Sequence, residues 1–100
     1  MSDKFYFKVH SHQSEVVIAL CDDDILGQTF TDTGKKFYVS PAFYGDELVD
    51  EVFVRDNITA FTILNIAGNR AVDLAISAGI ISPANVIDIG GMKHAQAVRM

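Results

Sequence analysis

The feature that most constrains the fold is a continuous apolar run at residues 16–21, Val-Val-Ile-Ala-Leu-Cys. A strand with one solvent-facing side alternates polar and apolar residues, whereas an unbroken apolar run of this length is typical of a strand covered on both faces. Residues 4–10 do alternate, which predicts a strand with one buried face. Because only the polar break at residues 11–14 separates the two segments, we expect them to form a hairpin.

The clearest helix is predicted at residues 69–78. Most of its positions are apolar, and Arg70, Asp73 and Ser77 share one narrow polar stripe, which is the pattern of a largely buried helix. Gly79 supplies the left-handed residue that commonly ends a helix. Together these elements predict an α/β (α+β) fold, with a small single-layer mixed sheet, one main buried helix and several short helical turns. The remaining strands are expected at residues 36–40, 58–66 and 86–89.

Capping residues predict the short helical turns. The three aspartates at residues 22–24 offer N-cap oxygens and first-turn negative charge to a turn through residues 25–26. The same carboxylates could bind a hard cation, but capping explains them more simply. Ser40-Pro41 and Ser82-Pro83 each place a proline at the first helical position behind a capping serine.

Three segments have weaker signals. Residues 30–34 are expected to be a turn-rich connection. Residues 46–56 fit helical spacing and a short strand equally well, so both structures stay open there. Residues 92–100 follow the Gly90-Gly91 pair and show weak structural preference, which predicts a flexible C-terminal tail on a single domain spanning residues 1–100.

Composition limits the class of protein. With 100 residues and 49% of them hydrophobic, the chain has material for one core and lacks the signature of disorder. Cys21 is the only cysteine, which excludes an intrachain disulfide and is usual in a reducing compartment. No signal-peptide pattern opens the sequence, and the longest apolar-rich stretch is about half of the roughly 20 residues that a membrane-spanning helix needs. We therefore expect a cytoplasmic protein without a membrane partner.

Charge is distributed unevenly along the chain. The net charge of −5 disfavours indiscriminate binding to nucleic acid, because that affinity comes mostly from basic residues that displace counterions. Up to Asp56 there are five basic residues and eleven acidic ones, whereas from Asn57 onward there are three basic residues and two acidic ones. The second half is therefore the better place for an anion to bind.

Several motifs resemble a known family. They include Asn-Ile-Ala-Gly-Asn-Arg-Ala-Val at residues 65–72, Ile-Gly-Gly at 89–91, His-Ala-Gln at 94–96 and Leu-Gly-Gln-Thr-Phe at 26–30. Together they resemble the archaeal family called domain of unknown function 424, and residues 46–60 match it least. The resemblance implies an archaeal source, a compact cytoplasmic α/β domain without an established activity, and an association with RNA binding in the translation apparatus.

The first candidate site is the junction of Asn65, Gly68, Asn69 and Arg70. A strand that breaks at glycine and enters a helix presents free backbone N–H groups and the positive helix end to an anion, and Arg70 could add a planar fork for a phosphate. The alternative is a purely structural role, in which Gly68 makes the turn, Asn69 caps the helix and Arg70 pairs with Asp73. The spacing is neither that of a P-loop nor that of a dinucleotide-binding glycine motif.

The second candidate site follows the strand expected at residues 86–89. Residues just after a strand terminus often line sites because a rigid scaffold holds them at the surface. The histidine in this segment could act as donor, acceptor or base, or it could simply lie on the surface of a mobile tail. The residues of this site are Gly90, Gly91, Lys93, His94 and Gln96.

Three functions stay open from the sequence. We favour a non-enzymatic binding module that contacts RNA, a ribonucleoprotein or a translation-related protein through the two candidate sites. One alternative is a small enzyme for a phosphorylated or carboxylated molecule, with His94 as acid or base. Another is a protein-interaction or homodimer-forming domain, because a small domain buries only part of its apolar surface alone. No cofactor and no metal site is predicted, since His10 and His12 lack a third ligand at a recognisable spacing.

Overall fold

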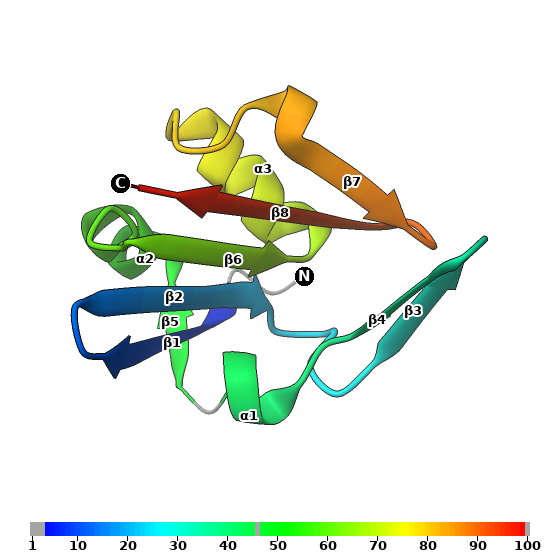
Figure 1. Cartoon of the computed structure of the whole chain (residues 1–100), viewed down its shortest axis with the longest axis horizontal. Helices are drawn as coiled ribbons and strands as arrows, with labels where there is room; N and C mark the ends of the chain where they lie inside the picture. Colours follow the sequence, from blue (N-terminus) through cyan, green and yellow to red (C-terminus); the bar gives the residue numbers. More distant parts are fainter. Residues whose placement is uncertain (1–3, 46, 100) are drawn as a thin grey trace.

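A six-stranded mixed sheet forms the centre of the computed structural model, which describes residues 4–45 and 47–99. The strand order is β5-β1-β2-β6-β8-β7 (Figure 1). The two middle neighbours, β2 and β6, run parallel, and every other neighbouring pair is antiparallel. The strands are β1 (Lys4–His12), β2 (Glu15–Asp22), β5 (Leu48–Asp50), β6 (Ile63–Ala67), β7 (Val86–Ile89) and β8 (Met92–Val98).

The predicted N-terminal hairpin is confirmed. Strands β1 and β2 pair from Phe5 opposite Asp22 to His12 opposite Glu15, so β1 continues two residues beyond the expected strand. Gln13 makes the tight turn with a positive φ of 54°. In β1 the predicted alternation is confirmed at Phe5 and Phe7, which are buried on the face that two helices cover, whereas Val9 on the same face is exposed.

Helices α2 (Glu51–Asn57) and α3 (Asn69–Ser77) cover one face of the sheet. The predicted main helix is confirmed as α3, which ends one residue earlier than expected. Its apolar stripe buries Ala71, Val72, Leu74 and Ala75 against the strands β2, β6 and β8. Burial of such a stripe is what stabilises a nine-residue helix that would be marginal by itself.

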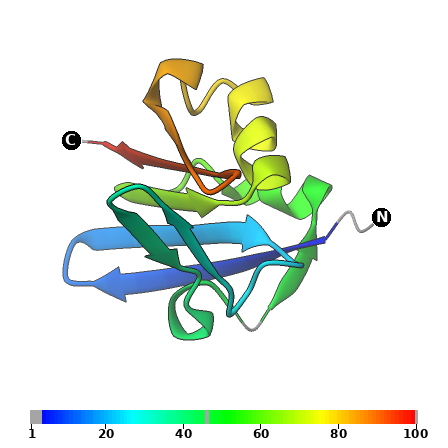
Figure 2. The same cartoon turned by 90° about the vertical axis from the view of Figure 1, so that its right-hand side faces the viewer.

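The opposite face is covered by α1 (Pro41–Tyr44) and by a second, two-stranded sheet of β3 (Thr29–Asp32) and β4 (Lys35–Tyr38). Figure 2 shows this hairpin (teal) crossing in front of the large sheet. The sheet presents small side chains here, Ala19, Cys21 and Ala67, and these pack with Tyr44. Strand β2 is thus buried on both faces, as its unbroken apolar run predicted.

The short turns at Ser40-Pro41 and Ser82-Pro83 are confirmed as α1 and as a 3-10 helix, η1 (Pro83–Asn85). Gly45 closes α1 by donating its N–H to the carbonyl of Pro41 at 3.0 Å. In η1 the Ser82 hydroxyl accepts from the N–H of Ala84. No helix among the described residues is long and apolar enough to cross a membrane.

The prediction of a flexible tail is wrong for residues 92–98. These residues form β8, which lies between β6 and β7 and buries Met92, His94 and Ala95. The segment has only one β-branched residue, Val98, so its local strand preference is weak. Pairing with neighbours on both sides, rather than local preference, makes it a strand.

The predictions around residues 22–34 need two corrections. The helical turn through residues 25–26 is absent, and residues 23–27 form turns and a bend instead. The expected turn-rich connection at residues 30–34 is mostly the β3–β4 hairpin, closed at Gly34 with a positive φ of 74°. The strand expected at residues 36–40 is present as β4 at residues 35–38, whereas β3, with one aromatic residue among Thr and Asp, offers little hydrophobic periodicity to detect.

The ambiguous segment 46–56 holds both of its alternatives in succession, because described residues 48–50 form β5 and Glu51 begins α2. Asp50 marks the switch, since its carboxylate accepts from the N–H of Phe53 at 2.9 Å and caps the helix. The strand expected at residues 58–66 is shorter than predicted. It begins only at Ile63, because Ile58 still belongs to the C-terminal cap of α2.

Candidate functional site

The first candidate junction lies where two parallel strands end side by side. Strands β2 and β6 pair from Val17 opposite Ile63 to Cys21 opposite Ala67, so Asp22 and Gly68 follow at the same edge of the sheet. The Asp22 carboxylate accepts from the backbone N–H groups of Arg70 at 3.1 Å and Ala71 at 2.8 Å. The positive end of α3, one of the two interpretations of which was a site for an external anion, thus already holds a carboxylate of the chain.

Gly68 permits this close approach. Its φ of 111° is one that L side chains rarely adopt, and a Cβ atom there would lie 2.4 Å from Cγ of Asp22. The carboxylate is only 5% exposed, and burial raises the pKa of Asp22 while its hydrogen bonds from Ala71 and Arg70 act in the opposite direction. The glycine therefore does more than turn the chain.

The two basic side chains of the candidate sites are engaged with carboxylates. The Arg70 guanidinium lies 2.7 Å from Asp23 and 3.9 Å from Asp22, rather than pairing with Asp73. Asp73 instead receives Lys93, at 3.1 Å. An RNA phosphate at either cation would have to compete with these ion pairs.

The two candidate segments meet in space through Asn69. Its side-chain Nδ2 donates to the carbonyl of Gly91 at 3.2 Å, and its Oδ1 accepts from the N–H of Lys93 at 2.9 Å. The N–H of Gly68 adds a bond to the carbonyl of Lys93. Asn69 therefore ties the start of α3 to the β7–β8 turn, in which Gly90 and Gly91 have φ values of 60° and 87°, rather than capping its own helix.

The remaining candidate residues lie on the face of the sheet opposite α3. Asn65 of β6 is opposite Gln96 of β8, and Ala67 is opposite His94, so the three polar side chains share one face. The buried hydroxyl of Tyr44 donates to Oδ1 of Asn65, which holds the amide at the margin of α1. Gln96 is exposed.

His94 has a defined protonation state. Its Nδ1 lies 2.8 Å from the carbonyl oxygen of Ile66, and because a carbonyl can only accept, Nδ1 carries the proton and Nε2 keeps its lone pair. The side chain is 7% exposed, and burial lowers the pKa of His94. Its ring centroid lies 4.5 Å from that of Phe37 in β4. His94 is therefore a neutral hydrogen-bond acceptor at neutral pH.

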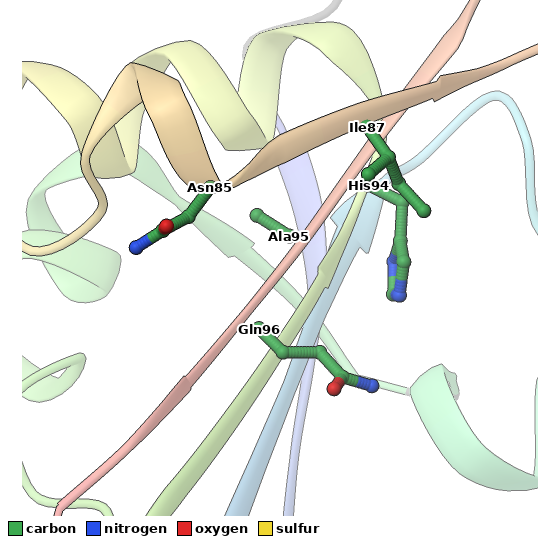
Figure 3. A pocket seen from close by; sticks show the side chains of 5 residues that line it. All are labelled: Asn85, Ile87, His94, Ala95 and Gln96. Carbon is green, nitrogen blue, oxygen red and sulfur yellow. The ribbon is translucent and has the colours of Figure 1, made fainter.

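An open hollow of about 460 Å³ lies beside this residue. Figure 3 shows the His94 ring and the Gln96 amide on the same side of β8, with Asn85 where η1 passes into β7. None of the lining residues is an acid, a lysine or an arginine, so the hollow offers amide groups, one imidazole nitrogen and apolar surface. The lining residues are Asn85, Ile87, His94, Ala95 and Gln96.

Sequence reasoning missed several members of these sites. Asp22 was correctly interpreted as a capping residue but for the wrong helix, since its partners lie 48 and 49 residues further along the chain. Tyr44 and Phe37 were not identified as site residues, because nothing in the local pattern connects either with β6 or β8. Asn85 and Ile87 lacked any signal, because their role depends on where β7 begins. Among the described residues no group of three His, Cys, Asp or Glu side chains is placed to hold a metal ion.

Comparisons with known proteins give a family and a fold. The family model "Protein of unknown function (DUF424)" matches residues 10–100, as the resemblance predicted. The crystal structure of an uncharacterized conserved protein from Methanopyrus kandleri is similar with a TM-score of 0.76 at 23% sequence identity. It covers 94% of this chain and 90% of that chain. No curated protein matches the chain.

Proposed function

We propose that this chain, which belongs to the family of proteins of unknown function DUF424, is a non-enzymatic binding module whose ligand occupies the hollow beside β8. The observation that carries the proposal is the neutral His94, held by Ile66 so that its Nε2 stays available as an acceptor beside the exposed amides of Gln96 and Asn85. Convergent polar groups in an apolar concavity are the usual form of a binding site.

The chemistry of the hollow favours an uncharged, hydrogen-bonding ligand. Amides offer donors and acceptors together, and none of the lining side chains supplies a cation for a phosphate. The cations of the two candidate segments, Arg70 and Lys93, are paired with aspartates. Association with RNA in an archaeal cytoplasm, which the family resemblance implies, would thus depend on bases or on a protein partner rather than on these two side chains.

The enzymatic alternative has less support. General acid–base chemistry needs a second group that positions or receives the proton, and the lining around His94 supplies only amides and apolar side chains. Burial lowers the pKa of His94, which makes the imidazole a weaker base. The one thiol, Cys21, is buried on another strand.

Capture from a native lysate tests the proposal. The bait is the wild-type protein, with Gln96→Arg as the variant that fills the hollow. The control is Gln13→Arg, which makes the same substitution at an exposed turn between β1 and β2. We expect the wild type and Gln13→Arg to retain the same protein or RNA and Gln96→Arg to lose it. Equal retention by all three would contradict the proposed site, and a parallel capture with ribonuclease reports whether RNA carries the interaction.

A further inference from the structure

We propose that the occupant of the hollow is an extended peptide segment of another protein, which pairs through its backbone with the free outer edge of β8. This inference rests on the proposed function and names the partner for that site. The two sides of β8 are paired over different lengths. On the β6 side, β8 is paired as far as Val98, whereas on the β7 side its register ends at Ala95 opposite Val86. Within the described chain, the register gives residues 96–98 no partner on the outer side.

The backbone of this edge points outward at the required positions. The carbonyl of Lys93 accepts from Gly68 and the N–H of Arg99 donates to Thr62, so the odd-numbered residues of β8 turn toward β6. In an antiparallel ladder the hydrogen-bonding groups alternate between the two sides of a strand. Gln96 and Val98 therefore direct their N–H and C=O groups toward the outer side of β8, beyond the point where pairing with β7 ends.

The edge also lacks the usual protection. Natural sheets shield a free edge with charged side chains, proline or a bulge, and Gln-Ala-Val at residues 96–98 has none of these. The next residue, Arg99, is charged, but its side chain is directed away from the free edge of β8. Its Nη1 donates to the carbonyl of Thr59 at 2.9 Å, and its guanidinium lies 4.5 Å from the ring centroid of Phe61. An unguarded edge is the template that a strand-adding peptide needs.

The side chains around the edge fit an added strand. His94, Gln96 and Val98 share one face of β8, and Ile87 lies opposite His94 on the same face. Val98 is 65% exposed and Ile87 is 44% exposed, so both offer apolar contact to alternate side chains of a peptide. The Asn85 amide lies where the peptide would continue the line of β7.

Charge favours a peptide over the other occupants. Two copies of a chain with net charge −5 repel each other, which disfavours pairing of β8 with β8 of a second copy. A single-stranded RNA would find no basic side chain in the lining. A peptide needs no basic side chain in the lining, because its affinity comes from backbone hydrogen bonds beside a neutral surface.

Peptide selection followed by backbone methylation tests the inference. Displayed random peptides are selected on the wild-type protein, and a selected sequence is synthesised with one N-methyl group at each successive position. We expect methylation at alternate positions to weaken binding at least about tenfold and methylation at the intervening positions to have little effect. Strand addition would be overturned if methylation weakened peptide binding at every position, at no position, or at positions that do not alternate.

Protein variants separate this result from the proposed function. Val98→Pro removes an outward N–H and should weaken the selected peptide about tenfold, whereas Val98→Ala keeps the N–H and should change affinity less than about threefold. Circular dichroism of both variants checks that they are folded. If lysate capture depends on Gln96 but no peptide is selected, or if RNA or a second copy of the chain is the occupant, the strand inference fails while the binding site stands. If capture is indifferent to Gln96→Arg, the proposed function fails.

Discussion

The Asp22 carboxylate caps α3, which begins at Asn69, by accepting from the backbone N–H of Ala71 at 2.8 Å from a position 49 residues earlier in the chain. This bond replaces the external anion that the same helix end would otherwise attract. The helix terminus is thus filled, whereas polar groups remain available on the sheet face at β8. The stability of the junction should therefore depend on Asp22 more than on the neighbouring aspartates.

Replacing Asp22 should destabilise the fold selectively. Asp22→Ala leaves two N–H groups of α3 without their acceptor, and we expect a loss of about 1–3 kcal/mol in the free energy of unfolding. Asp23→Ala removes only the partly exposed ion pair with Arg70 and should cost about 1 kcal/mol or less. Urea denaturation of the two variants measures both values, and an equal cost would show that the capping bonds contribute nothing special.

The pH dependence of the same group has a defined sign. Burial raises the pKa of Asp22 above its ordinary 3.8. At a pH between 3.8 and the raised pKa, the folded state therefore binds more protons than the unfolded state. The stability of the wild type relative to Asp22→Asn should therefore increase as the pH falls from neutral toward 4. Denaturation midpoints of both proteins across this range test the sign, and a relative loss on acidification would mean that the pKa is lowered instead.

His94 should act in the opposite direction. Burial lowers its pKa below 6.5, so the unfolded state takes up its proton first as the pH falls. The wild type should lose stability relative to His94→Gln as the pH falls from 6.5 through the lowered pKa of the folded state. Nitrogen-15 NMR of the wild type checks the protonation state directly. We expect the Nδ1–H tautomer, bonded to Ile66, and an Nε2–H tautomer would contradict the proposed acceptor.

Two glycines with positive φ should respond differently to alanine. Gly79→Ala places a Cβ in open space and should cost only the backbone strain of about 1–2 kcal/mol. Gly68→Ala adds a collision with the carboxylate of Asp22 and should cost at least about 3 kcal/mol. Thermal or chemical unfolding compares the pair, and similar losses would show that Asp22 moves aside easily.

Much of the fold could be predicted because it follows local patterns. The alternating β1, the unbroken apolar run of β2, the polar stripe of α3 and the proline-started turns all have sequence signals. Residues 92–98 could not be identified as a strand in the same way, because Lys93, His94 and Gln96 have little strand preference and are held by partners from β6 and β7.

Part of the candidate site could likewise be predicted from the sequence and part could not. Asn69, Gly91 and Lys93 were singled out separately, and the structure brings them together in one set of hydrogen bonds. The filling of the anion position by Asp22 could not be predicted, since it depends on the parallel pairing of two strands that lie far apart in the sequence. The hollow beside β8 depends on where β7 ends its pairing, which no local pattern records.

An amide NMR titration of the protein with the ligand recovered by the wild-type bait locates the binding site. If the ligand binds in the hollow, shift changes should concentrate at residues 85–87 and 94–98, and residues 68–71 at the start of α3 should be unaffected. Changes centred on Asn69 and Arg70, with residues 94–98 unmoved, would contradict the account and return the binding site to the helix terminus.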